Sequence, residues 1–154
     1  MSRQTKRCIK FGSFVLLTLY IAVLIYVCFF SEDYGRDVIT SYYRYNLIPF
    51  KEIRRFYIYR DVVGIRAFLA NLFGNVLAFM PYGFFMPILR PKLRRMSRMF
   101  LAAFLLSLTI EITQLLTRVG SFDVDDLILN TAGGIAGYLL FYIMNKIRSK
   151  WDGA

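Results

Sequence analysis

The chain has 154 residues, of which 57% are hydrophobic, 18% aromatic and 19% charged. A soluble domain has about 45–50% apolar and about 25% charged residues, so this composition excludes a large water-soluble catalytic domain and indicates one integral membrane domain over residues 1–154. The 20 Lys and Arg residues outnumber the 10 Asp and Glu residues, and histidine is absent. The commonest general base and zinc ligand is therefore missing, and we expect neither a metal nor a cofactor.

Four long apolar segments predict four transmembrane helices, since crossing the hydrocarbon core takes about 20 residues. The first segment follows four basic residues, so a secretory signal is the alternative. It is longer than the usual h-region of about 7–15 residues and no cleavage motif follows it, which favours a retained anchor. The chain is thus predicted to be an all-α, multi-pass bundle in the cell membrane, with spans at residues 11–30, 67–89, 99–117 and 127–145.

The distribution of basic residues predicts that both termini face the cytoplasm. The N-terminal segment, the link between the second and third spans, and the C-terminal tail together hold twelve basic residues and one acidic residue, whereas the other two loops hold eight of each. Short cytoplasmic loops carry the excess of Lys and Arg. Because topology and anionic lipid explain the net charge, we expect membrane lipid as a partner and no nucleic acid.

The long loop at residues 31–66 is predicted to lie on the outer face. Six of the eleven tyrosines are in it, and aromatic residues with basic neighbours favour the lipid headgroup layer. Ile53, Phe56 and Tyr57 are at helical spacing, and arginines occupy other parts of the wheel. Residues 51–60 therefore predict a short interfacial helix on the outer leaflet, with a solvated loop as the alternative.

Polar residues within the spans follow one face of each of three helices. Asn71 and Asn75 are on the second span, Glu111 and Gln114 on the third, and Asn130 on the fourth, all in the outer half of the bilayer. Polar and ionisable groups in spans are expensive and usually face a bundle interior or a water-filled cavity. We therefore predict one outward-facing binding site formed by Asn71, Asn75, Glu111, Gln114, Arg118, Asp123, Asp126 and Asn130.

Each of these residues also has a structural interpretation. Asn and Gln in membrane helices often only hydrogen-bond a neighbouring helix. At least one of Asp123, Asp125 and Asp126 is expected to cap a helix N-terminus. Glu111 favours the functional interpretation, because a buried carboxylate needs a partner or a raised pKa.

Two further patterns predict how the helices pack. Gly133 and Gly137 form a G-x-x-x-G pair, which lets a second helix approach closely. Pro81, Gly83 and Pro87 predict a kink in the second span, where neighbouring helices can satisfy the freed carbonyl groups.

Four motifs occur in order along the chain: NLIPF at residues 46–50, NVLAFMPYG at 75–83, SLTIEITQ at 107–114 and DVDDLILNTAGG at 123–134. Together they resemble the VanZ-like family of small membrane proteins. The resemblance implies that recurrent polar positions of the family coincide with the predicted site. It also implies reduced susceptibility to teicoplanin-type lipoglycopeptides for at least some members.

Three functions are compatible with this pattern. The first is an outward-facing cavity that binds a cell-envelope lipid or precursor, or a lipoglycopeptide antibiotic. The second is a membrane-embedded enzyme acting on a lipid-linked substrate, with Glu111 as general base and Asp126 or Asp123 as second acid or divalent-ion ligand. The third is a scaffold whose polar stripes bind a helix of another protein.

Overall fold

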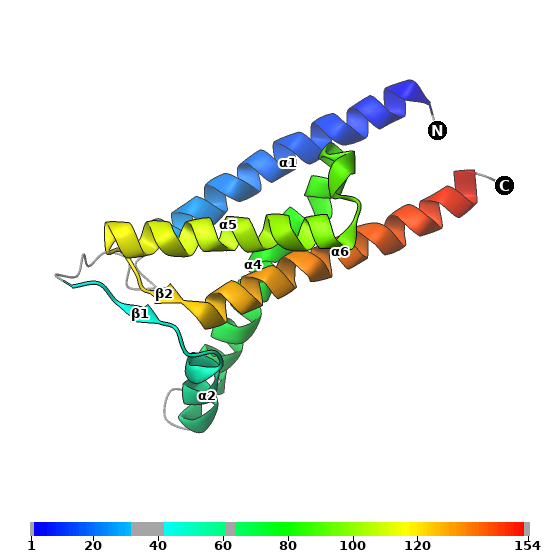
Figure 1. The fold of residues 1–154 in the computed structure, drawn as a ribbon. Coiled ribbons are helices and arrows are strands. Elements are labelled where there is room, and N and C mark those ends of the chain that lie inside the picture. Colours follow the sequence, from blue (N-terminus) through cyan, green and yellow to red (C-terminus); the bar gives the residue numbers. More distant parts are fainter. Residues whose placement is uncertain (1, 32–41, 61–63, 153–154) are drawn as a thin grey trace.

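The computed structural model describes residues 2–31, 42–60 and 64–152, and its architecture is a bundle of long helices (Figure 1). Four helices are long and apolar enough to cross a membrane, so the predicted all-α, four-helix membrane fold is confirmed. The first helix ends at Phe29, one residue before the end of its predicted span, and each of the other three helices contains its whole predicted span. These helices are α1 (Arg3–Phe29), α4 (Ile65–Leu89), α5 (Met96–Thr117) and α6 (Val124–Asp152).

Shorter elements connect the long helices. A 3-10 turn, η2 (Pro91–Leu93), joins α4 to α5. The predicted helix in the long loop is present as α2 (Lys51–Ile58), and its position on a membrane surface remains a prediction. The two-residue strands β1 (Tyr45–Asn46) and β2 (Phe122–Asp123) pair in parallel, which ties the long loop to the turn before α6.

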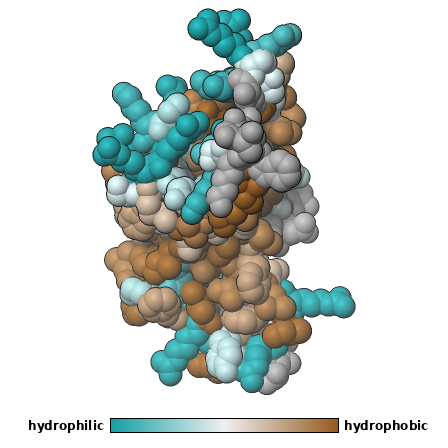
Figure 2. Space-filling model, turned by 90° about the vertical axis from the view of Figure 1, so that its right-hand side faces the viewer, coloured by the Kyte–Doolittle hydropathy of each residue, from teal (hydrophilic) through white to brown (hydrophobic). Residues whose placement is uncertain are grey.

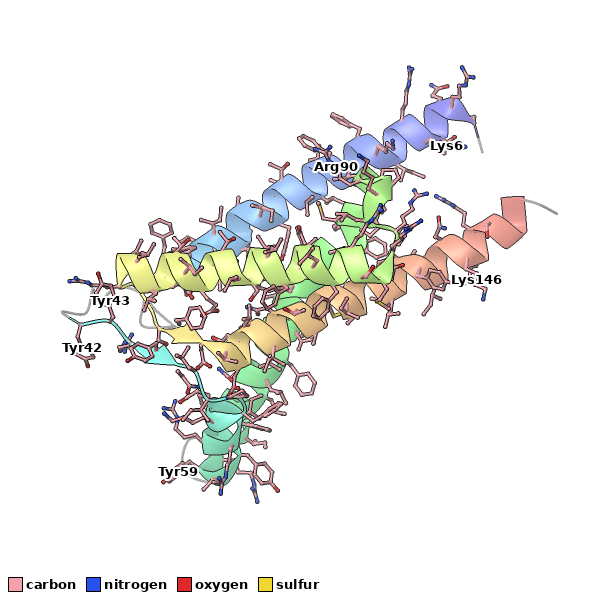
Figure 3. All side chains as sticks on the ribbon, viewed as in Figure 1. Lys6, Tyr42, Tyr43, Tyr59, Arg90 and Lys146 are labelled. Atoms are coloured by element: carbon pink, nitrogen blue, oxygen red, sulfur yellow. The ribbon has the colours of Figure 1, made fainter. Side chains whose placement is uncertain are left out.

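The two ends of the bundle differ in composition. The start of α1 and the end of α6 lie at one end, called here the terminal end, and α2, β1 and β2 lie toward the other, called the loop end (Figure 1). Lys6, Arg90 and Lys146 are at the terminal end, whereas Tyr42 and Tyr59 are at the loop end (Figure 3). Hydrophobic side chains occupy the middle of the view in Figure 2, with hydrophilic ones above and below. This arrangement fits a membrane-spanning bundle.

Glycines allow α4 and α6 to pack backbone to backbone. A Cβ atom at Gly133 would overlap the carbonyl oxygen of Val76, and one at Gly137 would overlap that of Met80. The predicted close approach at the G-x-x-x-G pair is therefore confirmed, with α4 as the partner helix. Small residues are favoured at such contacts because helix association in lipid depends on close packing.

Helix α4 continues through both of its prolines. The Tyr20 hydroxyl of α1 donates a hydrogen bond of 2.6 Å to the carbonyl of Ala78, in the turn before Pro81. Near the end of α4, the Arg94 Nε donates to the carbonyl of Pro87 at 3.1 Å. Groups from outside the helix thus bond two carbonyls of α4 near its prolines.

Candidate functional site

A cavity of about 130 Å³ lies where the four long helices meet toward the loop end. Helix α1 contributes an apolar wall that includes Leu24 and Val27. Helices α4, α5 and α6 contribute the polar wall, and we call the space the polar cavity. Its polar lining residues are Asn71, Asn75, Glu111, Gln114, Asp126 and Asn130.

Glu111 forms the buried acidic part of this wall. Its side chain is 2% exposed, and its Oε2 accepts a hydrogen bond of 2.9 Å from the backbone N–H of Asp123. Glu111 therefore connects the middle of α5 to the turn that begins α6, in addition to lining the cavity.

Asn130 has one polar atom without a partner. Its Nδ2 donates to the Ser107 Oγ at 3.0 Å, whereas its Oδ1 is buried and has no hydrogen-bond partner among the described residues. The side chain is only 4% exposed. An unsatisfied buried polar atom costs about 1–3 kcal/mol, and it belongs to a residue that lines the polar cavity.

The other amides of the wall join neighbouring helices. The Asn75 Nδ2 of α4 donates to the Asp126 Oδ1 of α6 at 2.6 Å. The Gln114 Nε2 of α5 donates to the carbonyl of Cys28 in α1 at 2.9 Å. These bonds hold four helices around one space, and they are the bonds that the structural interpretation of in-membrane amides predicts. Residues that were predicted to bind a ligand therefore also join the helices to one another.

A second, larger space of about 450 Å³ lies at the loop end, and we call it the vestibule. Asn71 and Asp126 line both the vestibule and the polar cavity. The vestibule contains three basic residues, one of which, Arg55, is bonded to Glu52 at 2.6 Å. Its lining residues are Arg44, Tyr45, Asn46, Lys51, Glu52, Arg55, Phe56, Asn71, Ser121, Asp123 and Asp126.

Asp123 fixes the wall of the vestibule and caps a helix. Its Oδ1 accepts hydrogen bonds from the Asn46 Nδ2 at 3.1 Å and from the backbone N–H of Asp125 at 2.8 Å. The second bond is the N-cap that α6 needs, so the predicted acidic cap is confirmed. Burial raises the pKa of Asp123, and the two hydrogen bonds partly oppose that shift.

Asp125 caps α2 from a different helix. Its carboxylate accepts the backbone N–H groups of Glu52 at 2.8 Å and Ile53 at 3.1 Å, and also that of Phe50. Phe50 has a positive φ of 64°, which is uncommon outside glycine. The Asp125 side chain is 1% exposed. It therefore sets where the long loop turns and where α2 lies over the vestibule.

The structure brings together most of the residues predicted to form the site. Six of them line the polar cavity, and Asp123 lines the vestibule. Arg118 lines neither space. Its guanidinium carbon is 4.6 Å from the centre of the Tyr43 ring, and it ends α5 in a left-handed conformation with φ of 59°.

Sequence reasoning did not assign Asn46, Arg44, Lys51 or Arg55 to the site. Asn46 is the first residue of the NLIPF motif, and its place in that motif was the signal that could have assigned it to the site. The basic residues could be seen only as members of a surface helix and loop. Their position over the start of α6 depends on the β1–β2 pairing and on the Asp125 cap, which are long-range contacts without a local sequence signal.

Ser107 is not presented as a nucleophile to either space. The Ser107 Oγ is bonded to Asn130 and the residue is fully buried, outside the lining of both spaces. Among the described residues, no group of three His, Cys, Asp or Glu side chains is placed to hold a metal ion. The arrangement offers acidic and amide groups to a hydrogen-bond donor in the polar cavity, and basic groups to an anion in the vestibule.

Comparison with known proteins identifies the family. The chain is 30% identical over 133 residues to "Protein VanZ" of Enterococcus faecium, an alignment that covers 85% of this chain and 74% of that protein. No solved structure matches the chain. The model of the VanZ/LLP1 family matches residues 17–145, which include all four predicted motifs. The chain therefore belongs to the VanZ/LLP1 family, as a multi-pass membrane protein.

Proposed function

We propose that the protein binds an amphiphilic cell-envelope molecule, a lipid-linked precursor with an anionic head. The head lies in the vestibule, and a hydrogen-bond-donating group reaches the polar cavity. The observation that carries this proposal is the unpartnered, buried Oδ1 of Asn130, a residue that lines the polar cavity, which shares Asn71 and Asp126 with the vestibule. A ligand hydroxyl or amide N–H would satisfy it.

The sizes of the two spaces indicate which part of the ligand each would hold. Pockets for drug-sized ligands measure about 300–1,000 Å³. The polar cavity, at about 130 Å³, admits only a small group. The vestibule, at about 450 Å³, is large enough for a phosphate with part of a sugar. Asn71 and Asp126 line both spaces, so one ligand can contact the two together.

The vestibule is lined by three basic and three acidic residues, and two of the basic side chains are available to an anionic head. Arg55 is partly neutralised by Glu52. Arg44 and Lys51 make no side-chain hydrogen bond or ion pair with any described residue, which leaves them available to a phosphate. Lys binds phosphate as a point charge, and Arg can bind it through two parallel hydrogen bonds. The exposed aromatic side chains of Tyr45 and Tyr57 suit the headgroup layer beside them.

The ligand is expected to enter from outside the cell. The basic residues at the terminal end favour a cytoplasmic position for that end, so the loop end with the vestibule faces outward. Tyrosines are frequent at the loop end, and tyrosine is enriched at membrane interfaces. An outward vestibule has access to envelope precursors and to antibiotics that act on them.

Binding of a polyprenyl phosphate to the protein in nanodiscs tests this function. A polyprenol of the same chain length, without the phosphate, is the matched neutral probe. The phosphate should bind more tightly, and Lys51→Gln should weaken it about fivefold, because one charge near a surface contributes about 1 kcal/mol. Arg54→Gln removes an exposed charge from the same helix outside the vestibule, and it should leave affinity unchanged. Equal affinity for the two probes would contradict the proposal.

A second pair of variants tests the polar cavity. Asn130→Leu removes the amide at similar volume and should weaken binding of a precursor with a donating head by about tenfold. Thr131→Val is the control, since the Thr131 hydroxyl bonds the carbonyl of Leu127 in its own helix at 2.7 Å. If both variants bind equally well, the polar cavity is a packing feature only.

We further propose that occupancy of this site contributes to teicoplanin-type resistance. Expression of the wild-type chain in a susceptible host should raise the teicoplanin concentration that inhibits growth. Asp126→Asn, which keeps the size of the side chain and removes its charge, should reduce that protection at equal protein abundance. If the variant gave full protection, resistance would not depend on this site. Direct binding of teicoplanin by the purified protein would instead identify the antibiotic as the ligand.

A further inference from the structure

A groove lies at the terminal end of the bundle, whereas the polar cavity lies toward the loop end. The groove has a volume of about 450 Å³ and is formed by α1, α4, α6 and the segment after η2. We call it the terminal groove. Most of its wall is apolar, and three phenylalanines belong to it. The apolar lining residues are Ile9, Phe84, Phe85, Ile88, Phe141 and Met144.

Two arginines line the same groove. The Arg94 side chain is held in place, since its Nε donates to the Pro87 carbonyl at 3.1 Å and its guanidinium carbon is 5.7 Å from the centre of the Phe141 ring. The Tyr138 hydroxyl fixes the backbone below it through a 2.7 Å bond to the Arg94 carbonyl. The terminal nitrogens of Arg94 make no hydrogen bond with any described residue.

The second arginine comes from α6. The Arg148 Nη2 donates to the Asn145 Oδ1 at 2.6 Å, and both residues line the groove. None of the described residues that line the groove is acidic. Two guanidinium groups therefore border an apolar groove at the level where the helices end, among the other basic residues of this end (Figure 3).

We propose that the terminal groove is a binding site for an anionic glycerophospholipid. Its phosphate lies between Arg94 and Arg148, and an acyl chain lies along the aromatic wall. Arginine matches phosphate geometry through paired hydrogen bonds. Basic pockets between membrane helices are suited to anionic lipid heads. The site is separate from the vestibule and does not depend on the function proposed for it.

The charge of the lining distinguishes an anionic lipid from a zwitterionic one. A choline or ethanolamine head brings a cation next to its phosphate, and the described lining has no carboxylate to receive it. A glycerol head brings hydroxyl groups instead, which Asn145 and Ser13 can bond. The same lining accepts the acyl chains of either lipid, so the preference resides in the head.

Native mass spectrometry of the purified full chain tests this site, with phosphatidylglycerol and phosphatidylcholine of identical acyl chains as probes. Phosphatidylglycerol should be retained more strongly. Arg148→Gln should reduce its retention about fivefold. Lys146→Gln removes a charge from the same end of α6 outside the groove and should change retention little. Equal retention of both lipids, or equal losses in the two variants, would show bulk charge attraction and overturn the proposal.

A size change tests the apolar part of the groove independently of charge. Ile9→Trp fills the groove and should lower retention of both lipids. Leu16→Trp adds the same bulk at an exposed position of α1 outside the groove, and retention should match that of the wild type. Circular dichroism confirms that both variants fold. Undiminished lipid retention by folded Ile9→Trp would place the lipid elsewhere.

Discussion

The Glu111 side chain accepts a hydrogen bond of 2.9 Å from the backbone of Asp123, across the turn between α5 and α6. A buried carboxylate in the third span thereby holds the residue that caps the fourth. The bond joins the wall of the polar cavity to the wall of the vestibule. A change at Glu111 consequently has a structural effect and a binding effect, and the two need separate variants.

Substitutions at Glu111 should separate these effects. Glu111→Gln keeps an oxygen that can accept from the Asp123 backbone, so the thermal stability of the purified protein should stay near that of the wild type. Glu111→Ala leaves that buried N–H without a partner and should lower the free energy of unfolding by about 1–3 kcal/mol. Melting followed by circular dichroism in detergent measures the difference. Equal melting temperatures for the two variants would show that the bond contributes little.

Asp125 should control the position of α2. Its carboxylate caps α2 by accepting several backbone N–H groups, and loss of a helix cap costs about 0.5–2 kcal/mol. Asp125→Ala should therefore raise amide hydrogen exchange in Lys51–Ile58 while α4 to α6 remain protected. Glu52→Gln is the control, because it removes the Arg55 ion pair on α2 and leaves the cap in place. Unchanged exchange in Asp125→Ala would contradict this role.

The α4–α6 contact should be intolerant of any side chain at its glycines. Gly137→Ala places a Cβ atom against the carbonyl oxygen of Met80, so the helices must separate. The variant should show a lower melting temperature and less folded protein after extraction. Gly12→Ala, where nothing lies within 4 Å, should be neutral or slightly stabilising because alanine favours helix. Equal stability of the two variants would mean that the helices are not in close contact.

The fold was largely predictable from the sequence, and the site was predictable in part. The lengths of the apolar segments predicted the four helices, and helical spacing predicted that Glu111 and Asn130 lie on inward faces. The vestibule was not predictable, because Lys51 reaches it only through a cap supplied by Asp125 from more than 70 residues later in the chain. Arg118 was predicted to belong to the site, but it stacks on Tyr43, whose position depends on the path of the long loop.

The orientation of the bundle in the membrane should follow the basic residues. Ser121→Cys, in the vestibule, should react with a membrane-impermeant maleimide in intact cells, and Ser149→Cys near the end of α6 should react only after lysis. Both variants are made in a chain whose Cys8 and Cys28, neither of which is in a disulfide, are replaced by serine. Labelling of both positions from outside would overturn the cytoplasmic placement of the termini.

Photocrosslinking tests the central claim most directly, because it reports where an amphiphile with an anionic head lies on the protein. A polyprenyl phosphate with a photoreactive group beside the phosphate is bound in nanodiscs, irradiated and mapped by peptide mass spectrometry. The account predicts labelling of residues 44–56 and 121–126 that unlabelled polyprenyl phosphate competes away and that Lys51→Gln reduces. Labelling confined to the lipid-facing surfaces of α5 and α6, unaffected by competitor, would contradict it.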